Sequence, residues 1–175
     1  MQLIKTDIPD LMILETTPHG DERGWFARYL DLDILKNSGI AFEPLQISQS
    51  HNADKGTLRG LHFQHPPHAE TKIVRCLKGA AFDVAVDLRP DSPTRHQWYG
   101  IEISEENKRA FIIPKGFAHG FVTLSEDTDL LYMTDHPWTK DAEDGLMWDD
   151  PKIGIEWPVE PQVLSQRDRA HKYLS

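Results

Sequence analysis

The sequence predicts a mainly β protein in a single domain, and three observations support this. The 175 residues are 39% hydrophobic, which is enough to bury one sizeable core. Prolines are spread along the chain between short apolar runs, a pattern typical of many strands joined by turns. No repeat, low-complexity tract or Gly/Ser-rich linker divides the chain. We therefore expect one β-sandwich or barrel with a few short peripheral helices.

The clearest predicted strand covers residues 80–88, AAFDVAVDL, because its side chains alternate between two faces. Phe82 and Val84 would lie on one face, and Asp83 and Asp87 on the other. Eight further runs have the length and composition of strands: residues 11–14, 25–30, 57–63, 71–77, 98–103, 109–113, 119–124 and 130–134.

Helix is predicted at only two places. Residues 31–39 begin with Asp31, a good N-cap, and end at Gly39, a common stop. Near the end of the chain, SQRD has the serine-to-acid spacing of a capping box, which predicts a short helix starting at Ser165.

Charge and cysteine content exclude several classes of function. The net charge of −9 argues against a protein that binds nucleic acid through a basic surface. Cys76 is the only cysteine, so no intrachain disulfide or cysteine zinc cluster is expected, and a reducing compartment suits the chain. There is no charged leader with an apolar segment and no run of about 18 apolar residues. We expect a cytoplasmic protein without a membrane or nucleic-acid partner.

The segment RGLHFQHPPHAETK, residues 59–72, concentrates residues that carry chemistry. On a strand, Arg59 and His62 would face opposite sides, but a bulge at Gly60 would bring both to the same mouth. Lys72, on the next strand, would point inward with His62. A buried lysine needs a partner, which would be Asp83 or an anionic ligand; the alternative is a solvated edge lysine.

Three roles are open to His62: metal ligand, general base or hydrogen-bonded core histidine. A second segment, FIIPKGFAHGF, places His119 at the start of a strand. Together with Gly60, His62, Glu70 and Gly79, this is similar to the paired motifs of the cupin superfamily, whose fold is a jelly roll (double-stranded β-helix). Metal cupins carry His-x-His and a later Glu as ligands. Here Gln64 replaces the second histidine, so we expect no metal.

Longer motifs narrow the resemblance. HGDERGWF, RGLHFQ, HAETKIVRCLKGAAFDVAVDLRPDSPT, PKGFAHGF, GLMWDDPKIGIEWP and LSQRD resemble the dTDP-4-dehydrorhamnose 3,5-epimerase family from about residue 11 to 169. The resemblance implies a metal-free, cofactor-free cupin, usually a homodimer, spanning residues 1–175 as one domain. It implies epimerisation at C3 and/or C5 of a nucleotide-linked 4-keto-6-deoxyhexose, with dTDP-4-dehydro-6-deoxyglucose as the first candidate substrate.

Inversion beside a ketone requires a base, a partner for the enolate oxygen and an acid on the opposite face. The resemblance assigns these roles to His62, Lys72 and Tyr132, with Asp168 orienting the histidine as the aspartate of a triad does. A phenol, with a reference pKa of about 10, stays protonated until it is needed. Taken alone, Tyr132 could be an ordinary strand aromatic and Asp168 a helix cap.

The resemblance also implies the residues that bind substrate. Arg59 and Arg167 match positions that contact the phosphates or the sugar, a geometry that suits guanidinium groups. Arg23 lies in a segment that tends to cross the dimer interface, to which residues 1–45 are expected to contribute. The remaining predicted contacts are Phe26 and Trp138 at the nucleobase, the polar side chain of Gln46, and His119 near the sugar.

Three positions depart from the family pattern and leave the nucleobase open. Family members often carry Glu where Arg28 stands and Asn where Ser48 stands, and usually Tyr or Phe at Trp138. Two other functions compete with epimerisation. One is a metal-dependent cupin that uses His62, His65 or His68, Glu70 and His119. The other is a nucleotide-sugar-binding protein without activity, against which the presence of both Tyr132 and Asp168 argues, since binding alone needs neither.

Overall fold

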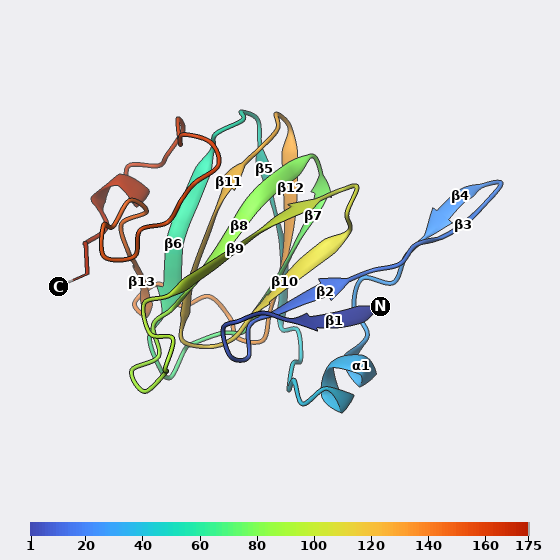
Figure 1. Cartoon of the computed structure of the whole chain (residues 1–175), viewed down its shortest axis with the longest axis horizontal. Coiled ribbons are helices and arrows are strands. Elements are labelled where there is room, and N and C mark those ends of the chain that lie inside the picture. Colours follow the sequence, from blue (N-terminus) through green and yellow to red (C-terminus); the bar gives the residue numbers. More distant parts are fainter. Residues whose placement is uncertain (175) are drawn as a thin grey trace.

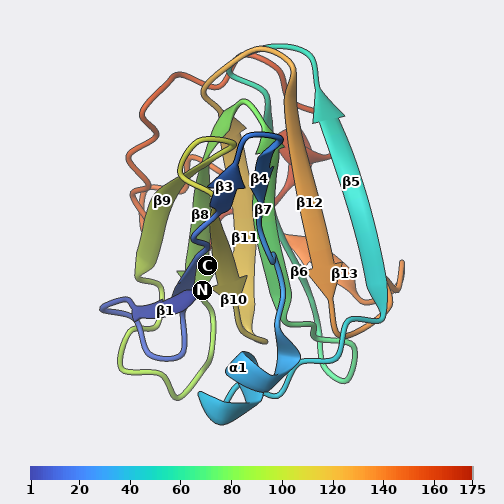
Figure 2. The same ribbon diagram turned by 90° about the vertical axis from the view of Figure 1, so that its right-hand side faces the viewer.

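A computed structural model describes residues 1–174 and confirms the mainly β architecture. Two antiparallel sheets face each other (Figure 1; Figure 2). The six-stranded sheet has the order β1 (Gln2–Lys5), β2 (Met12–Glu15), β10 (Arg109–Ile113), β7 (Lys72–Lys78), β12 (Thr128–Thr134), β5 (Gln46–Asn52). The five-stranded sheet has the order β13 (Glu143–Gly145), β6 (Leu58–Gln64), β11 (Phe117–Thr123), β8 (Ala80–Asp87), β9 (Trp98–Ser104).

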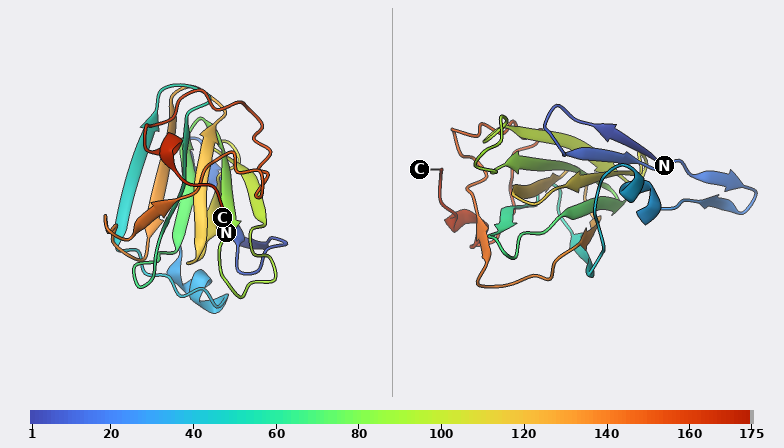
Figure 3. Two further views of the ribbon diagram at one scale, coloured as in Figure 1. Left: turned by 90° about the vertical axis from the view of Figure 1, so that its left-hand side faces the viewer. Right: turned by 90° about the horizontal axis from the view of Figure 1, so that it is seen from below.

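A small hairpin, β3 (His19–Asp21) and β4 (Gly24–Phe26), extends away from both sheets. It lies at the opposite end of the molecule from the C-terminal segment (Figure 3). Each of the nine predicted strand runs overlaps an observed strand, although the run at 25–30 retains strand structure only at Trp25 and Phe26. The patterns did not predict β1, β3, β5 and β13, of which β5 matters most because it lines the site.

The predicted helix is confirmed as α1 (Leu32–Asn37). Asp31 accepts hydrogen bonds from the backbone of Asp33 and Ile34, and Gly39 follows with φ 82°, the left-handed conformation that ends a helix. The helix predicted from Ser165 is shorter than expected: a 3₁₀ helix, η1, covers only Asp168–Ala170. Within residues 1–174, no helix has the length and apolar character needed to cross a membrane.

Both faces of β8 are buried, which its alternating pattern alone does not reveal. Ala85 packs inside the sandwich with Phe111 and Leu130. Val84 and Val86 point outward, but the segment after β13 covers them. The acidic residues of the strand therefore point into the protein interior, where each needs a partner.

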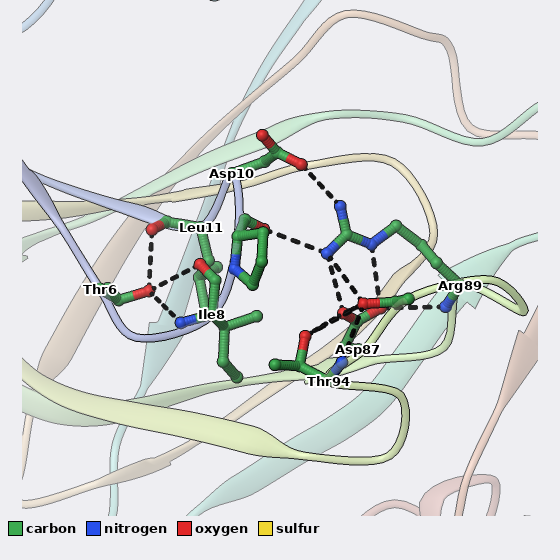
Figure 4. Close-up of polar contacts among 9 residues, drawn as sticks. Thr6, Ile8, Asp10, Leu11, Asp87, Arg89 and Thr94 are labelled. Atoms are coloured by element: carbon green, nitrogen blue, oxygen red, sulfur yellow. Dashed lines mark hydrogen bonds and ion pairs between the residues drawn. The ribbon is translucent and has the colours of Figure 1, made fainter.

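Asp87, at the end of β8, is fully buried and joins two loops (Figure 4). Its carboxylate accepts hydrogen bonds from Arg89, Ser92 and Thr94 at 2.5–3.0 Å. Arg89 also pairs with Asp10, in the turn between β1 and β2, at 2.8 Å. Burial by itself would raise the pKa of Asp87, but these donors outweigh it and lower the pKa to about 2.

Replacing Asp87 with asparagine should destabilise the protein, because an amide cannot accept the same set of charged hydrogen bonds. We expect Asp87→Asn to lower the free energy of unfolding at pH 7 by about 1–3 kcal/mol, measured by urea denaturation. The native carboxylate has a pKa below its unfolded value, so its contribution is complete above about pH 4. The difference between the two proteins should therefore shrink as the pH falls from about 4 towards 2.

Asp91 provides the matched control, because it lies exposed in the same loop and makes no side-chain hydrogen bond among residues 1–174. Asp91→Asn should leave the urea midpoint unchanged. Equal destabilisation by both substitutions would contradict the role given to Asp87.

Candidate active site

A cavity of about 400 Å³ opens between the two sheets and borders the apolar core, with Phe121 and Tyr132 in contact with both. Its walls carry residues from both sheets and from the loop after β12. Seven of the eleven residues predicted to act at the site line it: Gln46, Arg59, His62, Lys72, His119, Tyr132 and Trp138.

The bulge predicted at Gly60 is confirmed. The register between β6 and β11 pairs His62 with His119 and Arg59 with Phe121, so β6 carries one extra residue there. Gly60 has φ 125°, and a Cβ at this position would lie 2.6 Å from the Gly120 Cα, so only glycine fits. As a result, Arg59 and His62 both reach the cavity.

His62 is held from behind by Asp168. The His62 Nε2 lies 2.6 Å from Asp168 Oδ1, while the Ser165 hydroxyl donates to Oδ2 at 2.9 Å. Asp168 is almost fully buried, which by itself would raise its pKa, but the contact with His62 and that with Ser165 lower it. Ser165 also caps the turn, because its hydroxyl accepts from the Asp168 backbone N–H at 3.0 Å, and the carboxylate of Asp168 orients His62. The hydrogen bond through Nε2 leaves Nδ1 of His62 as the nitrogen able to accept a proton.

Tyr132 enters the cavity from the opposite sheet. It lies on β12, its hydroxyl is 2.9 Å from the Ser50 hydroxyl on β5, and its ring packs edge-on to His119. Surrounding protein raises its pKa above the ordinary phenol value, because desolvation disfavours the anion. The phenol therefore stays protonated at neutral pH and is available as a proton donor.

The predicted pairing of Lys72 with Asp83 is wrong. The Lys72 ammonium lies 3.0 Å from Glu70 Oε1, and both side chains are largely buried. Asp83 instead contacts the ring of His119, Nε2 to Oδ1, at 2.6 Å. The reason is the sheet assignment: Asp83 lies on β8 directly beside β11, whereas Lys72 lies on β7 in the other sheet.

Trp138 and Arg167 meet at the mouth of the cavity through Glu143. Its carboxylate accepts from the Trp138 indole at 2.7 Å and pairs with Arg167 at 2.8 Å. Gln46 accepts from the Trp138 backbone N–H at 2.9 Å, which fixes the start of this loop. Arg167 thus lies at the rim: it does not line the cavity itself but contacts Glu143, which does.

Arg23 and Phe26 lie outside the cavity of their own chain, and the expected contribution of their segment across a dimer interface stays a prediction. They lie on the β3–β4 hairpin with 84% of the Arg23 side chain and 68% of Phe26 exposed. Figure 1 shows this hairpin projecting from the sandwich, away from β6 and β13. Arg28 does not line the cavity either; it pairs with Asp31 at the start of α1.

The alternative metal set is not brought together as predicted. Glu70 and His119 are engaged by Lys72 and Asp83, and His65 pairs with Asp144 on the surface. A different set of possible metal ligands does converge within residues 1–174. It consists of His62, Asp168 and His171, whose ligand atoms all lie within 4.8 Å of one another.

Sequence reasoning missed Glu143, Ser50 and His171 as residues at or behind the cavity. Ser50 lies on β5, where Gln46, Ser48 and Ser50 face the cavity while Ile47 points to solvent. A strand with polar residues at alternate positions was the available signal, but the inward face of a strand is ordinarily the apolar one. Glu143 and His171 had no such pattern.

The fold and this arrangement of side chains define a cupin-type enzyme with groups suited to proton transfer on two sides of one cavity. The family model described as dTDP-4-dehydrorhamnose 3,5-epimerase matches residues 5–175, and the chain belongs to this family of isomerases. It is 46% identical over 169 residues to dTDP-4-dehydrorhamnose 3,5-epimerase from Shigella flexneri, covering 96% of this chain and 93% of that protein.

Solved structures agree with this assignment. The epimerase from Bacillus anthracis, with TDP and PPi bound, superposes with a TM-score of 0.96 at 41% identity and covers 99% of both chains. The Legionella pneumophila enzyme in complex with dTDP-4-keto-L-rhamnose has a TM-score of 0.93 at 41% identity, covering 98% of this chain and 92% of that one. The predicted family, jelly-roll fold and enzyme class are therefore confirmed.

The raised pKa of Tyr132 predicts that this phenol does not ionise in the ordinary range. Alkaline titration followed by tyrosinate absorbance should give the same curve for the native protein and Tyr132→Phe up to about pH 10, because desolvation keeps the Tyr132 phenol protonated there. The curves should separate only at higher pH. A difference with a midpoint near the reference value would contradict the desolvated position of the hydroxyl.

Proposed function

We propose that this protein inverts C3 and C5 of a nucleotide-linked 4-keto-6-deoxyhexose, converting dTDP-4-dehydro-6-deoxyglucose to dTDP-4-dehydrorhamnose. One observation carries the proposal: His62, held by Asp168, and Tyr132 open onto the same cavity from opposite sheets. Each inversion removes one proton from a carbon beside the ketone and returns one to the other face. Groups on two sides of a bound sugar suit this task.

His62 is the proposed base. Asp168 accepts a hydrogen bond from the Nε2–H group, which fixes the tautomer in which Nδ1 is the proton acceptor. The carboxylate also stabilises the imidazolium cation that forms when Nδ1 takes a proton from the substrate. Loss of this carboxylate would leave the ring free to turn. A protein that only binds a nucleotide sugar has no need of such a buried pair, so the pair favours catalysis over binding alone.

Lys72 and Tyr132 are proposed to complete the reaction. The Lys72 ammonium faces the cavity and would stabilise the negative charge that develops on the ketone oxygen, while Glu70 holds it in place. Tyr132 would return a proton from the face opposite His62. Its protonated state at neutral pH supports this direction of transfer.

Substrate binding is proposed to use the residues around the mouth. Arg59 would hold phosphate or sugar oxygens, Arg167 would reach the diphosphate from the rim, and His119 would contact the sugar. Gln46 and Trp138 would contact the nucleoside. A crystal structure of a relative with dTDP-4-keto-L-rhamnose bound supports dTDP as the nucleotide.

We further propose that the protein is a cytoplasmic homodimer and a single domain. In this arrangement residues 1–45 contribute to the interface, and the β3–β4 hairpin of one protomer brings Arg23 and Phe26 to the cavity of its partner. The exposed aromatic side chains of Trp25 and Phe26 on a projecting hairpin support an intermolecular role.

Solvent deuterium tests the chemistry. With dTDP-4-dehydro-6-deoxyglucose in D₂O, the native protein should introduce label at both C3 and C5, detected by mass spectrometry and NMR. His62→Asn should lower incorporation by about 10²-fold or more, because it removes the base. Tyr132→Phe should still exchange protons on the His62 face but form little inverted product.

His65→Asn serves as the control, because this exposed histidine also pairs with a carboxylate but does not line the cavity. It should retain full activity. If the folded native protein introduced no deuterium into this nucleotide sugar, the result would contradict the proposed activity on it.

Mixed dimers test the contribution of the hairpin. Arg23→Ala should raise KM, and His62→Asn should abolish turnover, each as a homodimer. Mixing and reassociating the two variants creates hybrids in which one site has both native residues, so activity at low substrate should recover to about a quarter of the native value. Light scattering should give twice the monomer mass of 20.1 kDa. No recovery in proven hybrids would contradict exchange of Arg23 between protomers.

A further inference from the structure

His171 lies behind the catalytic pair and has no assigned role. Its ring packs edge-on to His62, with centroids 5.5 Å apart, and its Nε2 lies 3.5 Å from the same Asp168 Oδ1 that contacts His62. Only 9% of its side chain is exposed. Its Nε2 has no hydrogen-bond partner among residues 1–174. A buried polar atom without a partner is costly, at about 1–3 kcal/mol, and calls for an explanation.

The position of this ring is set by its surroundings. Gly145 lies directly against it, and a Cβ at Gly145 would overlap the imidazole. The next residue, Lys172, forms a parallel bridge with Leu146, and its carbonyl accepts from the Met147 N–H at 3.0 Å. The His171 ring is therefore held toward Asp168 before any ligand arrives.

Two imidazoles and one carboxylate therefore converge on a common point. The ligand atoms of His62, Asp168 and His171 all lie within 4.8 Å of one another. Zn²⁺ binds such nitrogen and oxygen atoms at about 2.0 to 2.2 Å, and sites with two histidines, one carboxylate and an open fourth position are common. His62 borders the cavity with 27% of its side chain exposed, so a small movement of its ring would bring the three atoms onto one ion.

We infer that His62, Asp168 and His171 form an inhibitory binding site for a borderline divalent transition-metal ion, with Zn²⁺ as its representative. The ion would take the place of the proton that now lies between His62 and Asp168. Binding to Nε2 requires the lone pair of that nitrogen, so the single proton of the neutral ring moves to Nδ1. Nδ1 can then no longer accept a proton from the substrate.

The electrostatic surroundings favour a cation. Asp168 is ionised, and the carboxylates of Glu143 and Asp144 lie near the group. Arg167 is the opposing positive charge, and it is paired with Glu143.

Binding is tested on the purified full-length protein without reference to activity. Isothermal titration with Zn²⁺ should give one saturable site, and Co²⁺ should develop the visible absorption of a low-symmetry nitrogen and oxygen site. His171→Asn should weaken binding by at least about tenfold. His171→Phe is a second variant that keeps ring volume. His65→Asn, which removes a histidine from an isolated surface pair with Asp144, should leave the affinity unchanged.

Inhibition of catalysis by the bound ion rests on the proposed epimerase function and is measured in a separate experiment. Zn²⁺ should inhibit deuterium incorporation by the native protein and by His65→Asn, and chelation should restore it. His171→Asn should be active and resist Zn²⁺ at least about tenfold better. Mg²⁺, which prefers oxygen ligands, should have no effect.

Absence of saturable Zn²⁺ binding by the native protein would overturn the inference, as would Zn²⁺ affinity equal to that of the native protein in both His171 variants. Absence of epimerase activity would overturn the proposed function but leave the binding result intact, because calorimetry and Co²⁺ absorption do not depend on turnover.

Discussion

The hydrogen bond between His62 and Asp168 is the contact on which the organisation of the site depends. It joins a strand in the middle of a sheet to a residue 106 positions later, in the last turn of the chain. A buried carboxylate is stable as an anion only with good donors, and His62, together with Ser165, supplies them. The same bond selects the tautomer of the ring and leaves Nδ1 as the nitrogen able to accept a proton.

The interior of the sandwich combines an apolar core with a polar cavity that borders it. In the core, residues such as Phe111 and Leu130 fill the space between the sheets. Around the cavity, most ionisable groups that would be costly to bury have a close partner: Lys72 with Glu70, and His119 with Asp83. Tyr132 stays neutral there. A cavity lined in this way can take up an anionic substrate and support a transient negative oxygen without collapse of the fold.

Segments outside the two sheets carry much of what distinguishes the site. The C-terminal segment covers the outer face of β8, and it also supplies Asp168, Arg167 and His171, whose Nε2 has no hydrogen-bond partner in the described part of the chain. The β3–β4 hairpin carries exposed arginine and aromatic side chains away from the body. The C-terminal segment therefore adds side chains to a cavity whose strands mainly set the positions of His62 and Tyr132, whereas the hairpin adds an exposed surface outside it.

The sequence by itself determined the strands with clear alternation, the capped helix at Asp31, the bulge at Gly60 and the family, because each depends on neighbouring residues or on long ordered motifs. It failed for β5, whose polar face turns inward, and for the partner of Lys72. Only the tertiary structure decided that Glu70 pairs with Lys72, that Asp83 pairs with His119, and that His171 packs against His62. Local periodicity states which face a side chain occupies, whereas the partner of a charge depends on distances between strands that are remote in the chain.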